Sequence, residues 1–169
     1  MKIILAQPRG FCAGVKRAIE TVERALARFG KPVYVRHEIV HNTHVVNDLA
    51  ARGVRKTDLP EALGAGDTVV IRSHGELKSV LDGLAARGVR CVNATCPNVV
   101  RIQKLVAQAE EEGRLPVIIG TRSHPEVEGI AGWCSRCAIF ESPEELENWV
   151  KNERISPDLP ICMVSQTTS

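Results

Sequence analysis

Residues 67–97 read DTVVIRSHGELKSVLDGLAARGVRCVNATCP, and this stretch decides the fold class. Asp67–Arg72 has the apolar centre Val-Val-Ile, which predicts a short strand buried on both faces. Leu77–Arg87 carries apolar residues at helical spacing, and Gly88 ends the predicted helix. Val89–Asn93 predicts a second strand. A strand, a helix and a strand in this order predict the parallel crossover unit of an α/β protein.

The same alternation extends in both directions from this unit. Further strands are predicted at Ile3–Gln7, Val33–Val35, Pro116–Gly120, Ala138–Phe140 and Ile161–Val164. Further helices are predicted at Val15–Phe29, Thr43–Arg52, Pro97–Glu112 and Ser142–Lys151. Two short repeats support duplicated units, because Leu-Ala-Ala-Arg-Gly-Val and Arg-Ser-His each occur twice. We therefore predict an α/β fold of repeated αβα units, with parallel sheets covered on both faces.

The composition is that of an ordinary globular protein. The chain has 169 residues, a formal net charge of +2, 25% charged residues and 4% aromatic residues. This balance argues against a disordered protein, and the few aromatic rings argue against a nucleic-acid partner. No apolar run approaches the roughly 20 residues of a membrane helix, so no membrane partner is expected. The apolar stretch after Lys2 is shorter than the ~7–15 residues of a signal peptide, which favours a cytoplasmic protein with reduced cysteines.

Polar motifs gather where the predicted strands end. They follow the strands in the order Gly10–Gly14, His41–Asn42, Ser73–Gly75, Ala94–Pro97, Ser123–Glu126 and Gln166–Thr168. In open parallel sheets, ligands bind at the carboxyl ends of the strands, where helix N-termini also point. The sequence therefore predicts that these motifs converge on one shared site.

Cys12 and Cys96 each stand where a helix is predicted to begin. A helix N-terminus lowers the pKa of a thiol and favours the thiolate, which is the form that binds metal. The alternative role for each is that of a small buried hydrophobic residue. The other four are expected to be structural, since they lie in or beside apolar strands: Cys91, Cys134, Cys137 and Cys162. Cys134-Ser-Arg-Cys137 is a CxxC, but no second CxxC or HxxxH completes a zinc site.

Three histidines lie at predicted strand ends beside Asn, Ser or Gly, namely His41, His74 and His124. Such turns often bind phosphate, and the alternative for each is an exposed loop histidine. Glu126 lies two residues after His124. A carboxyl in a closed, partly apolar site can be held protonated and act as an acid, whereas a loop glutamate is usually only solvated. Thr167 and Thr168 offer hydroxyl donors at the last strand end.

As an ordered set, these motifs resemble those of one family, the 4-hydroxy-3-methylbut-2-enyl diphosphate reductases (IspH or LytB proteins) of the non-mevalonate isoprenoid pathway. The matching segments are Arg-Gly-Phe-Cys12-Ala-Gly-Val, Val-His41-Asn42, Arg-Ser-His74-Gly-Glu, Ala-Thr-Cys96-Pro, Ser-His124-Pro-Glu126-Val-Glu-Gly and Ser-Gln-Thr167-Thr168. Each motif alone is weakly specific, whereas the ordered set covers essentially the whole chain and is very specific. The version Arg-Ser-His-Gly-Glu is similar to that of the clostridial-type branch.

The resemblance implies three similar αβα domains in a pseudo-symmetric trefoil around a central [4Fe-4S] cluster. Residues 1–13 would form an N-terminal strand and cluster loop, 14–96 the first domain and 97–169 an incomplete second domain, with the third domain absent from this chain. Cys12 and Cys96 match two of the three cysteines that hold the cluster in the family. The third belongs to an Asn-Ser-Thr-Cys type segment, which this sequence lacks, as it lacks the family's Ser-x-Asn diphosphate segment.

The activity that the resemblance implies is a reductive dehydroxylation. Two electrons and two protons remove the hydroxyl of an allylic diphosphate as water, and the products are isopentenyl and dimethylallyl diphosphates. Glu126 matches the proton donor, with His124 and Thr167 completing its hydrogen-bond relay. Together with His124 and Thr167, His41 and His74 match the residues that bind the diphosphate. The implied electron donor is ferredoxin or flavodoxin, because the sequence contains no GxGxxG motif that would bind a nicotinamide cofactor.

Two other classes of function remain open on the sequence alone. One is a non-catalytic α/β protein, either a fragment that awaits a partner or a diphosphate-binding module without a complete cluster. The other is a thiol enzyme that uses Cys12 as nucleophile with a neighbouring histidine. A cluster protein is brown and bleaches in oxygen, whereas a thiol enzyme is colourless and is alkylated at one cysteine. With two cysteines at cluster positions, residues 1–169 alone are expected to be inactive and to self-associate through an exposed apolar face.

Overall fold

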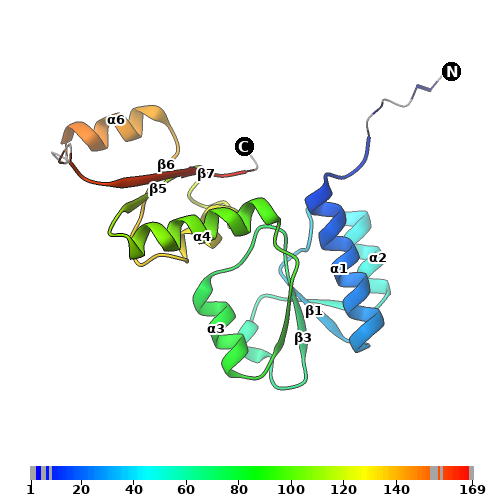
Figure 1. Cartoon of the computed structure of the whole chain (residues 1–169). Helices are drawn as coiled ribbons and strands as arrows, with labels where there is room; N and C mark the ends of the chain where they lie inside the picture. The colour runs from blue at the N-terminus through cyan, green and yellow to red at the C-terminus, as the bar shows by residue number, and fades with distance from the viewer. Residues whose placement is uncertain (1–2, 5–6, 8, 153–155, 157, 168–169) are drawn as a thin grey trace.

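The computed structural model describes residues 3–4, 7, 9–152, 156 and 158–167. Its strands form two parallel sheets, one after the other along the chain (Figure 1). The first sheet has the order β2-β1-β3-β4, with β1 at Val33–Arg36, β2 at Val54–Thr57, β3 at Thr68–Ile71 and β4 at Arg90–Asn93. The second sheet has the order β6-β5-β7, with β5 at Leu115–Ile119, β6 at Ala138–Phe140 and β7 at Ile161–Ser165.

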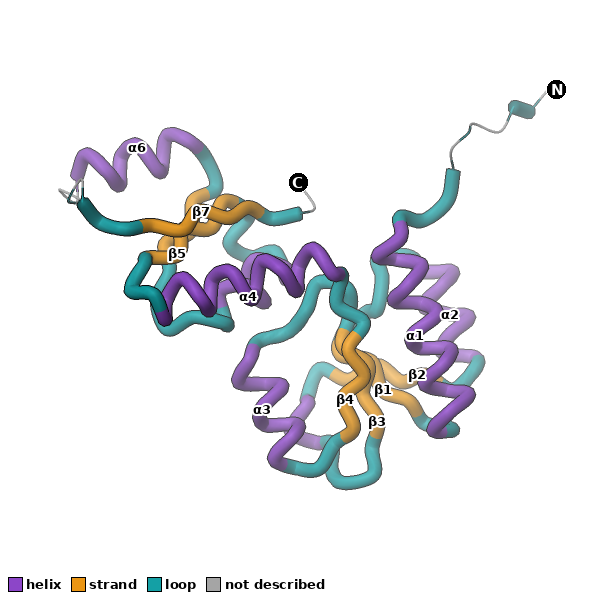
Figure 2. Tube along the Cα trace, in the orientation of Figure 1, coloured by secondary structure: helices purple, strands orange, loops and turns teal. Residues whose placement is uncertain are grey.

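Helices connect the strands and lie against the sheets (Figure 2). Their bounds are α1 at Ala13–Phe29, α2 at Thr43–Ala51, α3 at Lys78–Ala86, α4 at Pro97–Glu111, α5 at Pro125–Ala131 and α6 at Pro143–Asn152. One short 3₁₀ helix spans Pro60–Ala62. The predicted α/β class with parallel sheets is therefore confirmed.

The first sheet is buried on both faces. Val70 of β3 belongs to the same core cluster as Val22 of α1. Val69 and Ile71, its neighbours in the strand, pack instead with Leu84 of α3. Because successive side chains of a strand point to opposite faces, an uninterrupted apolar run requires a covering helix on each side. The run Val-Val-Ile is thus explained by α1 on one face and α3 on the other.

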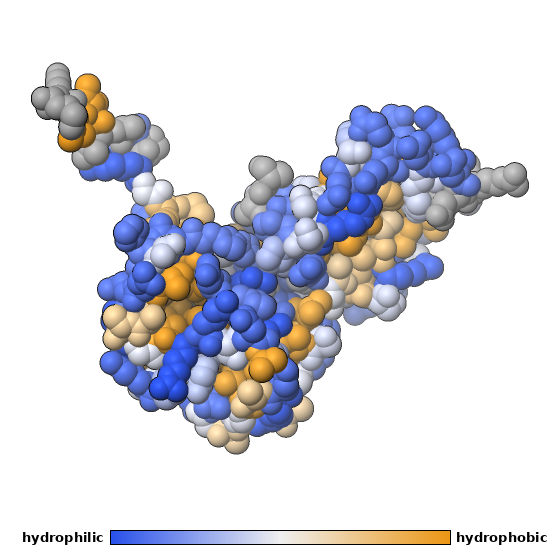
Figure 3. Space-filling view, turned by 180° about the vertical axis from the view of Figure 1, so that it is seen from behind, coloured by the Kyte–Doolittle hydropathy of each residue, from blue (hydrophilic) through white to orange (hydrophobic). Residues whose placement is uncertain are grey.

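The second sheet packs against α4 and α5. Val106 of α4, Ile118 of β5 and Ile130 of α5 are completely buried in one cluster. On α6, the ring of Trp149 lies 5.2 Å from that of Phe140 in β6. In the view from behind, hydrophilic side chains dominate the surface of α6 (Figure 3).

The expected apolar face is present along the edge strand β7. Ile161 and Met163 of this strand and Leu105 of α4 are all exposed. A cleft of about 580 Å³ runs between α4 and the end of β7. Self-association through this face stays a prediction. In the described part of the chain, we find no helix that is both long and apolar enough to cross a membrane.

Most predicted elements lie within two residues of the observed ones, but the short elements β2 and α5 were not predicted. The strand predicted at Ile3–Gln7 is wrong for the residues that the structure describes, and residues 5–6 lie outside them. Ile3 and Ile4 belong to no strand and are 73% and 79% exposed. A strand needs a neighbour to bond its backbone, and no described strand pairs with this segment. The motif Gly10–Gly14 therefore does not follow a described strand.

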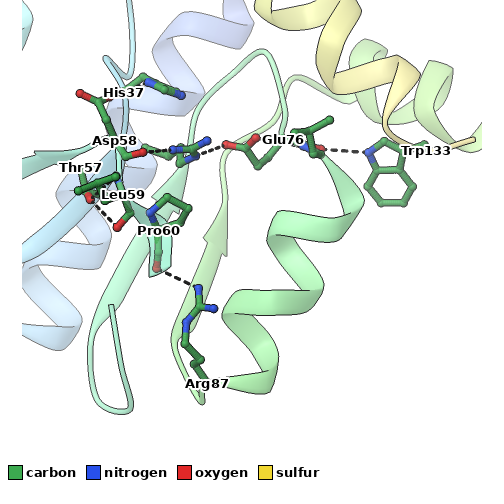
Figure 4. Close-up of polar contacts among 10 residues, drawn as sticks. His37, Thr57, Asp58, Leu59, Pro60, Glu76, Arg87 and Trp133 are labelled. Carbon is green, nitrogen blue, oxygen red and sulfur yellow. Dashed lines mark hydrogen bonds and ion pairs between the residues drawn. The ribbon is translucent and has the colours of Figure 1, made fainter. Parts of the chain in front are cut away.

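The loop after β3 holds the two sheets together. Trp133 follows α5, and its indole N–H donates to the backbone oxygen of Glu76 at 3.1 Å (Figure 4). The Glu76 carboxylate in turn pairs with Arg36 at the end of β1, at 2.8 Å. A Cβ at Gly129 of α5 would lie 3.2 Å from the backbone oxygen of His74. The close approach at Gly129 thus places α5 directly against the loop that carries His74.

We expect Gly129→Val to lower the free energy of unfolding by about 1–3 kcal/mol, because a branched side chain overpacks this contact. Urea unfolding followed by circular dichroism measures the effect. Gly64→Val is the matched control, since a Cβ at Gly64 meets no atom within 4 Å. An unfolding midpoint for Gly129→Val equal to that of the control would contradict the close contact.

Candidate functional site

Two thiols meet at the starts of two helices. Cys12 is the N-cap of α1, and Cys96 is the N-cap of α4 with Pro97 as the first helical residue. A Cβ at Gly14 would lie 3.9 Å from the Cys12 sulfur and 3.3 Å from the Cys96 sulfur. The two sulfurs therefore lie no more than about 7 Å apart. This is inside the roughly 10 Å expected for two thiolates on one cubane, so the predicted convergence is confirmed.

The backbone around Cys96 is held from the first sheet. Its N–H donates to the backbone oxygen of Ser73 at 2.9 Å, and the N–H of Thr95 donates to the side chain of Asn93 at 2.9 Å. Ala94 and Thr95 are buried. The Cys96 thiol is half-buried, whereas that of Cys12 is exposed. The sulfur of Cys96 is thus presented from a fixed turn.

This geometry fits two ligands of an iron–sulfur cluster. Among the described residues, neither Cys12 nor Cys96 caps its helix with a side-chain hydrogen bond. Both helix N-termini favour negative charge on the sulfurs, and Gly14 leaves the space between them free of a side chain. Within residues 3–4, 7, 9–152, 156 and 158–167, no group of three or more His, Cys, Asp or Glu side chains is placed to hold a metal ion. The described part of the chain therefore supplies two thiols to such a site.

Three histidines from different elements form a row. The rings of His41 and His74 are stacked with centroids 5.4 Å apart, and the ring of His124 lies edge-on to that of His74 at 5.5 Å. His41 precedes Asn42, whose side chain accepts from the N–H of Val45 and caps α2. A cleft of about 230 Å³ opens beside His41 and His74. The predicted gathering of these histidines is confirmed.

The hydrogen bonds of the histidines define which ring atoms are free to donate. Nδ1 of His124 accepts from the N–H of Glu126 at 3.1 Å, so the neutral ring of His124 carries its proton on Nε2. Nδ1 of His74 is buried and has no hydrogen-bond partner among the described residues. A buried polar atom without a partner is costly and often marks a place where a ligand or water binds. These donors suit an anion such as a phosphate.

Glu126 lies in the first turn of α5 and is completely buried. Its carboxylate accepts from the backbone N–H of Thr167 at 2.5 Å. The neighbouring Gln166 ties the ends of β5 and β7 together, since its side chain accepts from the N–H of Thr121 at 3.1 Å. Thr167 thus reaches Glu126 through its backbone amide, whereas the sequence pointed to its hydroxyl. Thr168 lies outside the described residues.

Arg72 belongs to this site, although sequence reasoning did not single it out. Its side chain is 8% exposed, and its Nε has no hydrogen-bond partner in the part of the chain that the structure describes. The charge of Arg72 acts on His74, whose pKa falls to about 4 because of burial first, then Arg72, His41 and His124. The sequence offered one signal for Arg72, which is its position directly after a strand predicted to be buried. An arginine at such a position is rarely buried without a role.

We expect the folded protein to lose stability as the pH falls from about 6.5 to about 4. The unfolded chain takes up a proton on His74 near pH 6.5, whereas the native ring takes it up only near pH 4. The native state therefore binds fewer protons in this window, and acid favours unfolding. Urea unfolding at several pH values measures the slope.

The variant His74→Asn should show a flatter dependence of stability on pH across the same window. His44→Asn, which changes an exposed histidine of α2, is the control and should keep the wild-type slope. Equal slopes for wild type and His74→Asn would show that His74 is not the group responsible.

The sequence matches known proteins over nearly its whole length. The family model described as LytB protein matches residues 3–169. A 4-hydroxy-3-methylbut-2-enyl diphosphate reductase from Polaromonas sp. is 51% identical over 169 residues, which cover 99% of this chain and 49% of that relative. The 4-hydroxy-3-methylbut-2-enyl diphosphate reductase 2 from Burkholderia mallei is 46% identical over 168 residues, which cover 99% of this chain and 50% of that relative.

Solved structures of such reductases have the same fold. The structure of the E-1-hydroxy-2-methyl-but-2-enyl-4-diphosphate reductase from Plasmodium falciparum matches with a TM-score of 0.87 at 32% identity, over 96% of this chain and 50% of that one. A structure of (E)-4-hydroxy-3-methyl-but-2-enyl diphosphate reductase, the terminal enzyme of the non-mevalonate pathway, matches with a TM-score of 0.80 at 36% identity. This match covers 99% of this chain and 58% of that one. The chain therefore spans about half the length of the relatives that it matches.

Proposed function

Because the chain belongs to the LytB protein family, we propose that it is the N-terminal portion of a 4-hydroxy-3-methylbut-2-enyl diphosphate reductase. The observation that carries this proposal is a chain of contacts from the thiols to the buried glutamate. Cys96 is bonded to Ser73 beside His74, the ring of His74 lies against that of His124, and His124 caps the helix that carries Glu126. The reaction is the reductive removal of the substrate's hydroxyl, and the products are isopentenyl and dimethylallyl diphosphates.

Cys12 and Cys96 are two of the three thiolates that hold a [4Fe-4S] cluster, and the third comes from outside the described residues. The chemistry supplied by the bound cluster is electron transfer and an open coordination position at one iron. Cys12 and Cys96 hold their sulfurs at the N-termini of two helices, where the helix dipoles favour the negative charge of a bound cluster. Ferredoxin or flavodoxin is the proposed source of the electrons.

The diphosphate binds at the histidine row. Nε2–H of His124 is a donor, because Nδ1 of the same ring is already an acceptor. His74 stays neutral at neutral pH and has an unused ring nitrogen, which donates to a phosphate oxygen as the N–H tautomer. His41 stacks on His74 and extends the row to the start of α2. The N-terminus of α2 there stabilises the negative charge of the bound diphosphate. The Thr167 hydroxyl is the last of the groups that donate to the diphosphate.

Glu126 delivers the proton that the leaving hydroxyl needs. Hydroxide is a poor leaving group, so the C–O bond breaks more easily when the oxygen departs as water. Two electrons and two protons enter, the C–O bond breaks, and an allylic C–H bond and one water form. Complete burial of Glu126 excludes bulk water from the carboxyl, and the Thr167 amide orients it. The His124 ring holds the backbone of Glu126 by accepting from its N–H.

The division of the chain follows the family resemblance. We propose a cluster loop at 1–13, a first domain at 14–96 and part of a second domain at 97–169, with both sheets contributing to one site. Isolated residues 1–169 would then be inactive, because a third thiolate is needed. The proposed compartment is the cytoplasm.

The test is reconstitution of the full-length protein with iron and sulfide under anaerobic conditions, followed by an assay with substrate and a low-potential electron donor. We expect a brown protein that bleaches in oxygen and forms isopentenyl and dimethylallyl diphosphates. A colourless protein that turns over another substrate and is alkylated at Cys12 alone would instead support a thiol enzyme.

A further inference from the structure

A pair of thiols lies outside the proposed site, in the loop between α5 and β6. The CxxC loop, residues Cys134–Cys137, contains two half-buried cysteines that hydrogen-bond to each other. The sulfur of Cys134 also lies 3.4 Å from the backbone oxygen of Ala131, at the end of α5. The proposed site lies at the other end of α5, about 10 Å away along a seven-residue helix. The function proposed above makes no use of these thiols.

The CxxC loop is held in place from both sides. Ser135 donates to the Glu110 carboxylate through its backbone N–H at 2.7 Å and through its hydroxyl at 2.6 Å. The N–H of Arg136 donates to the same oxygen at 3.2 Å. On the other side, the indole of Trp133 is bonded to Glu76 of the first sheet (Figure 4). These hydrogen bonds restrict the backbone of the loop and keep the two sulfurs in contact.

We propose that Cys134 and Cys137 form a reversible dithiol–disulfide site that exchanges with small disulfides of the glutathione class. Residues spaced as in CxxC form a disulfide within one short loop, and the partial exposure of both thiols gives an oxidant access. This proposal stands independently of the function proposed for the cluster site.

The environment gives the two thiols different roles. The hydrogen bond from Cys134 lowers the pKa of Cys137 to about 7, although burial and the charge of Glu110 oppose the shift. The same hydrogen bond, with burial, raises the pKa of Cys134. The Cys134 sulfur also lies in donor position to the backbone oxygen of Ala131, as a protonated thiol does, so Cys137 is the attacking thiolate and Cys134 is the thiol that resolves the mixed disulfide.

The exchange balances without any other reactant. The Cys137 thiolate attacks one sulfur of oxidised glutathione, forms a mixed disulfide and releases one glutathione thiolate. Cys134 then loses its proton and attacks the Cys137 sulfur, which releases the second glutathione. The protein dithiol loses two electrons and two protons, and oxidised glutathione becomes two thiols.

Mapping of the disulfide tests the proposal in the full chain. The reduced protein is equilibrated anaerobically with defined ratios of oxidised to reduced glutathione, quenched in acid and digested with trypsin without reduction. Trypsin cuts after Arg136, between the two cysteines, so the disulfide joins the peptides Ser123–Arg136 and Cys137–Lys151. We expect this linked pair to rise with the oxidised fraction and to disappear with dithiothreitol.

Serine variants separate the two roles. Cys134→Ser keeps a hydrogen-bond donor beside Cys137 and should trap one glutathione on Cys137. Cys137→Ser should form a mixed disulfide at Cys134 about tenfold more slowly at pH 7, because that thiol is mostly protonated. Cys162→Ser, a change in a half-buried thiol of the same core, should leave the linked pair unchanged.

Two results would overturn the proposal. One is that Cys134 and Cys137 stay reduced at every glutathione ratio while circular dichroism shows a folded protein. The other is that the oxidised protein pairs either cysteine with Cys162 or Cys96 and not with its loop partner.

Discussion

Replacing Glu126 by glutamine in the complete enzyme is expected to lower turnover by about 10²–10⁴-fold, the usual contribution of a positioned acid. The amide keeps the shape of the carboxyl and can still accept from the N–H of Thr167, which lies 2.5 Å from the carboxylate. It cannot deliver a proton. The iron content, the colour and the affinity for the diphosphate should therefore stay close to wild type.

A single-turnover assay under anaerobic conditions separates the proton transfer from substrate binding. Glu128→Gln is the matched control, because Glu128 lies on the same helix and is exposed. Its turnover should stay within a factor of about two of wild type, as expected for a surface change. Near-normal turnover in Glu126→Gln would move the proton donor to another group, such as the diphosphate of the substrate itself.

Replacing Cys96 by serine is expected to remove the cluster and, with it, all measurable turnover. A serine oxygen is a much weaker ligand for iron than a thiolate, and two remaining thiolates leave a second iron open to solvent. Iron and sulfide analysis after anaerobic reconstitution, together with visible absorbance, measures the loss. Cys12→Ser should behave in the same way, since both sulfurs border Gly14.

Cys162→Ser is the control for this experiment as well. Cys96 and Cys162 both pack against the core of the second sheet, so a loss of packing alone would affect both variants. Full iron content and turnover in Cys96→Ser would exclude Cys96 as a ligand and would leave its side chain a purely structural role.

The local sequence pattern was sufficient to predict those elements whose apolar residues recur with a clear helical or strand spacing. The run Val-Val-Ile predicted β3, and Pro97 with the apolar spacing behind it predicted α4. By contrast, α5 has seven residues and includes Gly129, so it offers too few turns to show a helical period. β2 has a single apolar residue, Val54, because it is an edge strand with one neighbour.

What the sequence by itself determined was the α/β class, the order of the elements and the polar residues at their ends. Those features follow from spacing along the chain, since parallel strands carry their helices to the same edge. Only the tertiary structure decided that Cys12 and Cys96 border one glycine, that Thr167 reaches Glu126 by its amide, and that Arg72 is buried beside His74. The first two contacts join residues far apart in sequence, and the burial of Arg72 depends on packing between elements. They depend on sheet order and on how closely α5 packs against the loop after β3, which no local pattern records.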